Sequence, residues 1–149
     1  MKTRLARAAL VLAVAGSYLV YVFQLSHAAF WTSGIGDWMD PYFINALLEH
    51  WYQSAISLRD PSSPPMYFPA RGTLGYSHGL VLFAVFYGPV RLFLHPFLAY
   101  NVTLLLVVAT GMLCLYVLLR RLGLSLAEAL ILTALFCTSK NVINGGTST

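Results

Sequence analysis

The chain has 149 residues, of which 58% are hydrophobic and only 9% charged, and its formal net charge is +4. Ordinary globular domains have roughly 25% charged residues. This composition excludes a soluble enzyme and a disordered tail, and the basic residues form no stripe with interleaved aromatics of the kind that binds nucleic acid. A run of 29 residues without Lys, Arg, Asp or Glu separates Arg7 from Asp37, and another of 28 separates Arg91 from Arg120. Each run exceeds the roughly 20 apolar residues that a helix needs to cross a bilayer, so the sequence indicates an integral membrane protein.

The first predicted element is a transmembrane helix over residues 8–30. Three basic residues, Lys2, Arg4 and Arg7, precede its apolar run. Basic residues at a membrane boundary stay on the cytoplasmic side, so we expect a cytoplasmic N-terminus and an exported segment after the helix. A cleaved signal peptide ending near residues 26–28 is the alternative, and it also leaves the following segment exported.

The exported segment is predicted to span residues 31–78 and to contain an amphipathic helix over 41–58. Its apolar residues follow the i, i+3, i+4, i+7 spacing of one helical face: Ile44, Leu47, Leu48, Trp51, Ala55 and Leu58. Asn45 and Glu49 are expected on the opposite, polar face. A helix of this kind, which carries Trp51 and follows directly after a membrane crossing, suits the plane of the membrane interface.

Three further transmembrane helices are predicted over residues 78–94, 97–119 and 126–143. The expected architecture is therefore an all-α integral membrane domain, residues 1–149, with about four transmembrane helices, in a multi-pass protein of the bacterial cytoplasmic membrane. With the N-terminus in the cytoplasm, the turn that carries Arg91 and His95 is cytoplasmic, and Arg120 and Arg121 are exported. The latter placement runs against the bias of basic residues toward the cytoplasm, but the first helix usually dominates orientation.

Asp37 and Asp40 are the candidate catalytic residues. A carboxylate at the membrane surface can accept a proton from an acceptor hydroxyl or bind a cation beside a phosphate. For Asp40 a structural role is equally suited, because Asp followed by Pro41 is a helix N-cap with proline at the first helical position.

Arg71, His78 and Glu49 are the candidate substrate-binding residues. A cation such as Arg71 or His78 at the exported surface can hold a lipid phosphate or simply contact headgroups. Glu49 is either a binding residue or a solvated side chain. The four histidines are too scattered to form a metal site, so no metal or other cofactor is expected, although the acidic pair leaves room for a divalent cation.

The order of these features resembles the N-terminal part of bacterial polytopic glycosyltransferases of the C type (the GT-C fold), over about residues 5–145. The landmarks follow the first predicted crossing: Gly36-Asp37, Asp40-Pro41, Met66-Tyr67-Phe68-Pro69, Tyr76-Ser77-His78, Tyr87-Gly88-Pro89, Ala99-Tyr100-Asn101 and Tyr116 to Leu122. The resemblance implies transfer of a sugar from a polyprenyl-phosphate carrier on the exported side. It also implies that the acidic role in the first exported loop falls on Asp40 or Asp37.

Members of such families have many more crossings, so the chain is expected to be an N-terminal fragment that is inactive alone. The expected partners are membrane lipid and the polyprenyl-phosphate sugar carrier, with no nucleic acid. The alternative function is a non-enzymatic membrane scaffold or assembly subunit, whose exported helix docks a protein partner.

Overall fold

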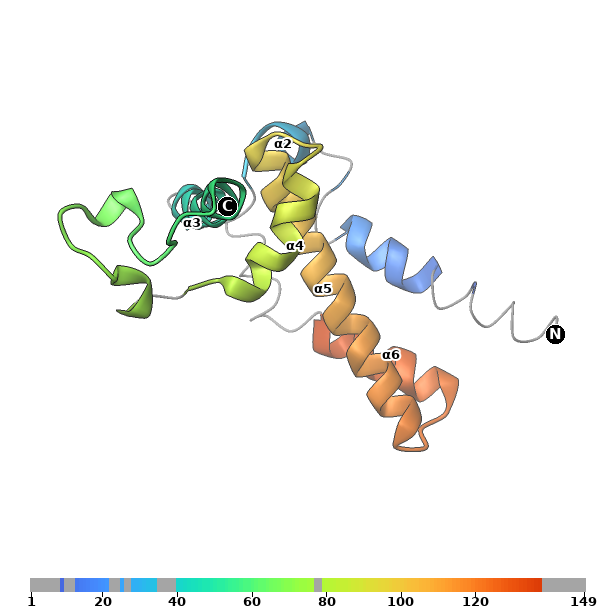
Figure 1. Cartoon of the computed structure of the whole chain (residues 1–149). Helices are drawn as coiled ribbons and strands as arrows, with labels where there is room; N and C mark the ends of the chain where they lie inside the picture. Colours follow the sequence, from blue (N-terminus) through green and yellow to red (C-terminus); the bar gives the residue numbers. More distant parts are fainter. Residues whose placement is uncertain are drawn as a thin grey trace.

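The computed structural model describes residues 9, 13–21, 25, 28–34, 40–76 and 79–137. All regular structure in these residues is helical, which confirms the all-α prediction for this part of the chain. Residues 13–21 are helical and are followed by seven helices: α2 (Ala28–Thr32), α3 (Asp40–Ser57), η1 (Pro65–Tyr67), η2 (Thr73–Tyr76), α4 (Val81–Arg91), α5 (Pro96–Arg121) and α6 (Leu126–Cys137). Figure 1 shows α5 as the long diagonal against which the others are arranged.

Helix α5 is the one described helix that is long and apolar enough to cross a membrane. Its 26 residues make it about 39 Å long at 1.5 Å per residue. Pro96 occupies its first turn, and the His95 imidazole accepts a hydrogen bond from the Leu98 N–H at 3.5 Å. Gly123, with φ of +89°, follows its last residue by two positions. The predicted range of 97–119 therefore agrees with this helix to within two residues.

Helix α4 is much shorter than the predicted helix over 78–94. It has 11 residues, and its length of about 16 Å is half of the roughly 30 Å hydrocarbon layer. Leu80 before it has a left-handed backbone with φ of 48°, and after Arg91 the chain turns, with the Leu94 N–H bonded to the Val90 carbonyl. The prediction of a full crossing here is not confirmed.

The first predicted helix differs from the structure, and the last is described only in part. A single helix over 8–30 is wrong, because Leu25 lies in a turn between residues 13–21 and the separate helix α2. At the other end, α6 begins at Leu126 as predicted and is described to Cys137, whereas residues 138–143 lie outside the described residues.

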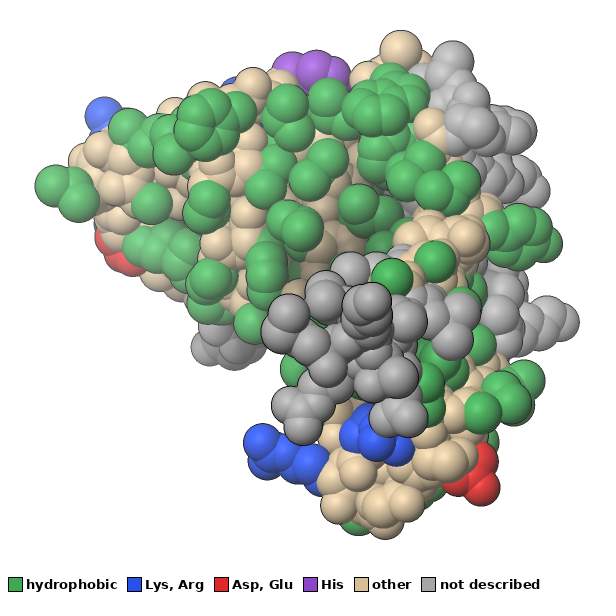
Figure 2. Space-filling view, turned by 90° about the vertical axis from the view of Figure 1, so that its right-hand side faces the viewer, with side chains coloured by type: hydrophobic (Ala, Val, Ile, Leu, Met, Phe, Trp, Pro, Cys, Tyr) green, Lys and Arg blue, Asp and Glu red, His purple; other side chains and the backbone are tan. Residues whose placement is uncertain are grey.

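The helices pack in two groups along α5 (Figure 1). At its N-terminal end, α3 and α4 pack around a core of Leu48, Tyr87, Ala99 and Tyr100. Further along α5, the buried ring of Phe30 contacts Tyr18 and Leu19 together with Leu98, Val102, Leu105 and Val108 of α5. In Figure 2 many hydrophobic side chains gather over the upper part of the face shown, and charged side chains are visible at its left edge and on its lower part.

Helix α3 was predicted over 41–58 and is observed at Asp40–Ser57, and Leu47 and Leu48 of the predicted apolar face are buried. Leu58, predicted on the same face, lies after the end of the helix with φ of 52° and is 94% exposed. Asn45, predicted on the polar face, is buried, because the Tyr87 hydroxyl of α4 donates a hydrogen bond to Asn45 Oδ1 at 3.3 Å. A buried amide is tolerated where it has a polar partner.

Asn101 attaches α2 and the residue after it to the start of α5. Its buried Nδ2 donates to the Phe30 carbonyl at 2.6 Å and to the Ser33 carbonyl at 2.7 Å. The amide thus satisfies two backbone acceptors at the C-terminal end of α2, where helical carbonyls lack partners. It holds the chain leading to α3 beside the N-terminal end of α5.

Replacing Asn101 with Leu is expected to destabilise the protein by about 3 kcal/mol, because two carbonyls lose their buried donor. The measurement is thermal unfolding in detergent micelles, followed by circular dichroism. Thr110→Val is the matched control, since the exposed Thr110 hydroxyl bonds only to Leu106 of its own helix. Equal unfolding temperatures for the two variants would contradict the role assigned to Asn101.

Candidate functional site

The candidate site lies at the N-terminal end of α3, around Asp40. The Asp40 side chain is exposed in the first turn of α3. Its charge is favoured there, because the unpaired N–H groups of a helix N-terminus carry partial positive charge. Asp40 is also close enough to the Tyr100 phenol of α5 to act on it electrostatically.

A close backbone approach fixes this end of α3. A Cβ added to Gly34 would lie 2.8 Å from Pro41 Cβ and 3.5 Å from Phe97 Cδ1. Real Cβ atoms do not approach so closely, so only glycine fits between α3 and the first turn of α5. Gly34 thereby determines where Pro41, and with it Asp40, can lie.

Aromatic side chains surround the same end of α3. The Tyr42 ring meets the Phe97 ring edge to face at 5.5 Å between centroids, and Phe43 meets Tyr67 of the following loop at 6.4 Å. Tyr42 and Phe43 remain 60% and 41% exposed. We call these four residues the aromatic rim. Partly exposed rings in the same helical turn as a carboxylate offer both an apolar surface and a charged hydrogen-bond acceptor.

The loop after α3 folds back along that helix toward Asp40. His50 Nε2 lies 2.9 Å from the Pro61 carbonyl, and Asp60 caps the turn by accepting bonds from the N–H and hydroxyl of Ser62. The ring contact of Tyr67 with Phe43 then lies one helical turn after Asp40. Arg71 follows in the same loop, where its side chain is exposed.

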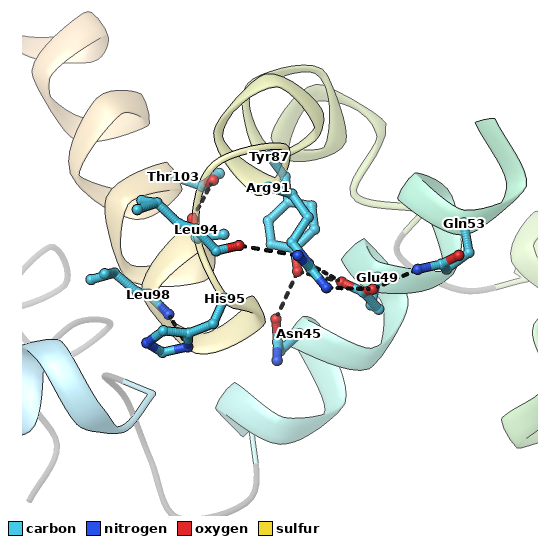
Figure 3. Close-up of polar contacts among 10 residues, drawn as sticks. Asn45, Glu49, Gln53, Tyr87, Arg91, Leu94, His95, Leu98 and Thr103 are labelled. Atoms are coloured by element: carbon cyan, nitrogen blue, oxygen red, sulfur yellow. Dashed lines mark hydrogen bonds and ion pairs between the residues drawn. The ribbon is translucent and has the colours of Figure 1, made fainter. Parts of the chain in front are cut away.

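Glu49 is held in a polar cluster between α3 and α4 (Figure 3). One carboxylate oxygen accepts a bond from Arg91 Nε at 2.8 Å and from the Tyr87 hydroxyl at 2.8 Å. The other accepts from Arg91 Nη2 at 3.2 Å and from Gln53 at 2.8 Å. The Arg91 guanidinium also donates to the Leu94 carbonyl and lies 5.2 Å from the centre of the Tyr52 ring.

This cluster keeps Glu49 ionised. Burial by itself would raise the pKa of Glu49, but the hydrogen bonds from Arg91, Gln53 and Tyr87, with the positive charge of Arg91, lower it below its ordinary value of 4.5. Paired hydrogen bonds between guanidinium and carboxylate are strong because both partners are charged and their shapes match.

The cluster places the C-terminal end of α4 beside α3. The turn after Arg91 was predicted on the cytoplasmic side and Glu49 on the exported side, with a full crossing between them. Arg91 and Glu49 lie 2.8 Å apart, so that full crossing is not confirmed, and the sides of the membrane stay a prediction.

The predicted site residues therefore fall into three groups. Asp40 and Arg71 are described and exposed. Glu49 is described, and both of its oxygens are engaged by α4 and Gln53. Asp37 and His78 lie outside the described residues.

Sequence reasoning missed Arg91 and Tyr87 as partners of Glu49. The available signal was the isolation of Arg91, the one Lys or Arg between Arg71 and Arg120. A lone charge in an apolar run requires a partner of opposite charge.

Within the described part of the chain, no group of three His, Cys, Asp or Glu side chains could hold a metal ion. An apolar cavity of about 360 Å³ lies further along α5, bounded by residues 14–19, by α5 and by α6. Its α5 lining consists of Ala109, Met112, Leu113 and Tyr116. Comparison with protein families, with curated proteins and with solved structures found no match to this chain.

Changing Glu49 to Gln is expected to lower the stability by about 2 kcal/mol, between the values for exposed and fully buried pairs. The side chains of Arg91 and Glu49 are 22% and 25% exposed, so Arg91 would lose a partly desolvated partner. Because folding lowers the pKa of Glu49, its contribution is present above pH 4.5 and disappears as the pH falls through the lowered folded value. The midpoint of urea unfolding, measured from pH 7 to pH 3 in micelles, should fall for the wild type and change less for the variant.

Glu128→Gln is the control for this series. Glu128 is fully exposed, and the hydrogen bonds to its carboxylate come from Ser125 of its own helix cap. A larger loss at pH 7 in this control than in Glu49→Gln would contradict the structural role of Glu49.

Gly34→Ala is expected to cost about 1–3 kcal/mol, because the added methyl group overlaps the rigid Pro41 ring. The matched variant is Gly111→Ala in α5, where a Cβ meets no atom within 4 Å. That change should be neutral or stabilise by up to about 1 kcal/mol through helix propensity. Thermal unfolding of both variants tests the close approach, and a neutral Gly34→Ala would contradict it.

Proposed function

We propose that this chain carries the exported acceptor-side part of a membrane glycosyltransferase that takes its sugar from a polyprenyl-phosphate donor. The observation that carries the proposal is the exposed Asp40 carboxylate in the first turn of α3, because Tyr42 and Phe43 in that same turn form ring contacts with Phe97 of α5 and with Tyr67. The resemblance to GT-C glycosyltransferases supports the same reading.

The chemistry of the site suits a sugar. The C–H faces of a sugar ring pack on exposed aromatic faces such as those of Tyr42 and Phe43, while a carboxylate accepts hydrogen bonds from hydroxyl groups. Asp40 would act as the general base that takes the proton from the attacking acceptor hydroxyl. Asp37, three residues earlier, is the second candidate for this role. Glu49 is left out of the proposed chemistry, because its oxygens hold α3 against α4.

The donor would lie along α5. Its phosphate belongs at the membrane surface, where Arg71 and His78 are the proposed binding residues and would offset the negative charge of the departing carrier. The apolar cavity is lined by residues 9–16 positions after Tyr100 on α5, which places it about 14–24 Å deeper along the helix. It would take up part of the isoprenoid tail.

In this proposal the N-terminus is cytoplasmic and the segment from α2 through the start of α5 is exported. The crossings are the helix containing residues 13–21, then α5, and then the helix that begins with α6. The described parts of the first and last of these helices are shorter than a full crossing, so we propose that both helices span the membrane.

Asp40→Asn is expected to reduce sugar transfer at least about 100-fold, the usual loss when a general base is removed. The measurement is transfer from a polyprenyl-phosphate sugar in membranes that contain the natural gene product. Asp60→Asn is the control, because Asp60 is an exposed carboxylate of the same exported segment whose hydrogen bonds go to Ser62.

Undiminished transfer after changing Asp37 and Asp40 together to Asn would overturn the proposed mechanism. If the protein transfers no sugar and instead purifies in mild detergent with one fixed partner, the scaffold function replaces the enzyme.

A further inference from the structure

Helix α4 has two apolar faces, and only one of them is covered by protein. Phe83, Ala84 and Tyr87 pack against α3 and α5. The opposite side carries Val81, Leu82 and Val85, and the turn after the helix continues it with Leu92 and Phe93. These five side chains are between 55% and 86% exposed. A helix that is apolar on all sides requires an apolar environment on its second face as well.

Charge is absent from the uncovered face. Arg91 is the one ionisable group with a charge on α4, and its guanidinium is turned toward Glu49 (Figure 3). On α5, against which α4 packs, Leu106, Val117 and Leu118 are also exposed. Trp51 borders it and donates its indole N–H to the Gly79 carbonyl at 2.6 Å, two residues before α4. Trp is typical of the boundary between lipid and water.

From these features we infer that α4 lies in the outer leaflet on the exported side and does not cross the membrane, and that the turn after it returns to the surface of that leaflet at His95. The partner of the uncovered face is bilayer lipid, because α4 packs against α5, the described helix that is long and apolar enough to cross a membrane. The length of α4 suits a helix that enters one leaflet only.

One consequence concerns the other end of α5. If the turn at residues 92–95 is exported, α5 runs from the exported side to the cytoplasm, and Arg120 and Arg121 are cytoplasmic. The conflict between the predicted four crossings and the bias of basic residues toward the cytoplasm then disappears. This inference rests on the membrane orientation given under the proposed function and is independent of sugar transfer.

Single-cysteine labelling with a membrane-impermeant maleimide tests the inference. Cys114 and Cys137 are first changed to Ala, and a cysteine is then introduced by Ser57→Cys, His95→Cys, Leu122→Cys or Val85→Cys. Each protein is labelled in sealed right-side-out vesicles, in vesicles opened by detergent and after denaturation in sodium dodecyl sulfate, which gives the total reactive thiol. Ser57→Cys, at the exposed end of α3, calibrates the exported side.

We expect His95→Cys to react in sealed vesicles as Ser57→Cys does, and Leu122→Cys to react only after opening. Val85→Cys should react at least ten times more slowly than Ser57→Cys, because lipid covers it. Labelling of His95→Cys only after opening would show that α4 crosses the membrane. Labelling of Leu122→Cys in sealed vesicles would show that α5 does not run from the exported side to the cytoplasm. Rapid labelling of Val85→Cys would place that face in water. Each of these three results overturns the inference, whereas inactivity in the transfer assay would leave it intact.

Discussion

The pairing of Arg91 with Glu49 is the constraint on which the arrangement of α3 and α4 depends. Arg91 is the one charged residue in an apolar stretch of the sequence, and leaving it unpaired in apolar surroundings would be costly. Glu49 meets this requirement with an ion pair made of two hydrogen bonds. Because Glu49 lies in the middle of α3, the pairing fixes where that helix crosses α4 and keeps the C-terminal end of α4 beside α3.

A second polar contact, made by Asn101, acts at the same end of α5. It secures α2 to the first turns of α5, while the arginine pair secures α3 to α4. Further along α5 the contacts are apolar, around Phe30 and the cavity. The described part of the molecule is thus held by directional hydrogen bonds near the N-terminal end of α5 and by nondirectional apolar packing further along it.

The sequence predicted those elements whose limits are set locally. Pro96 and Gly123 delimit α5, and the apolar periodicity after Pro41 predicts α3 to within one residue at each end. It did not predict the length of α4, because an apolar run has the same composition whether it crosses a bilayer or enters one leaflet. Nor did it predict the burial of Asn45, since an analysis of apolar periodicity assigns every Asn side chain to the polar face. The partner that allows this burial, Tyr87, lies 42 residues away, and such a contact is invisible to any local pattern.

Two carboxylates on α3 illustrate how structure separates a positioning role from a chemical one. Glu49 and Asp40 lie nine residues apart on the same helix, and the sequence alone makes both of them candidates for a site. In the structure the oxygens of Glu49 are occupied by Arg91, Tyr87 and Gln53, so a substrate hydroxyl would have to displace one of these partners. Asp40 is exposed in the first turn of the helix, where an incoming hydroxyl can reach it. The carboxylate that is bound tightly therefore fixes the helix, and the one that is left accessible is the one suited to act on a substrate.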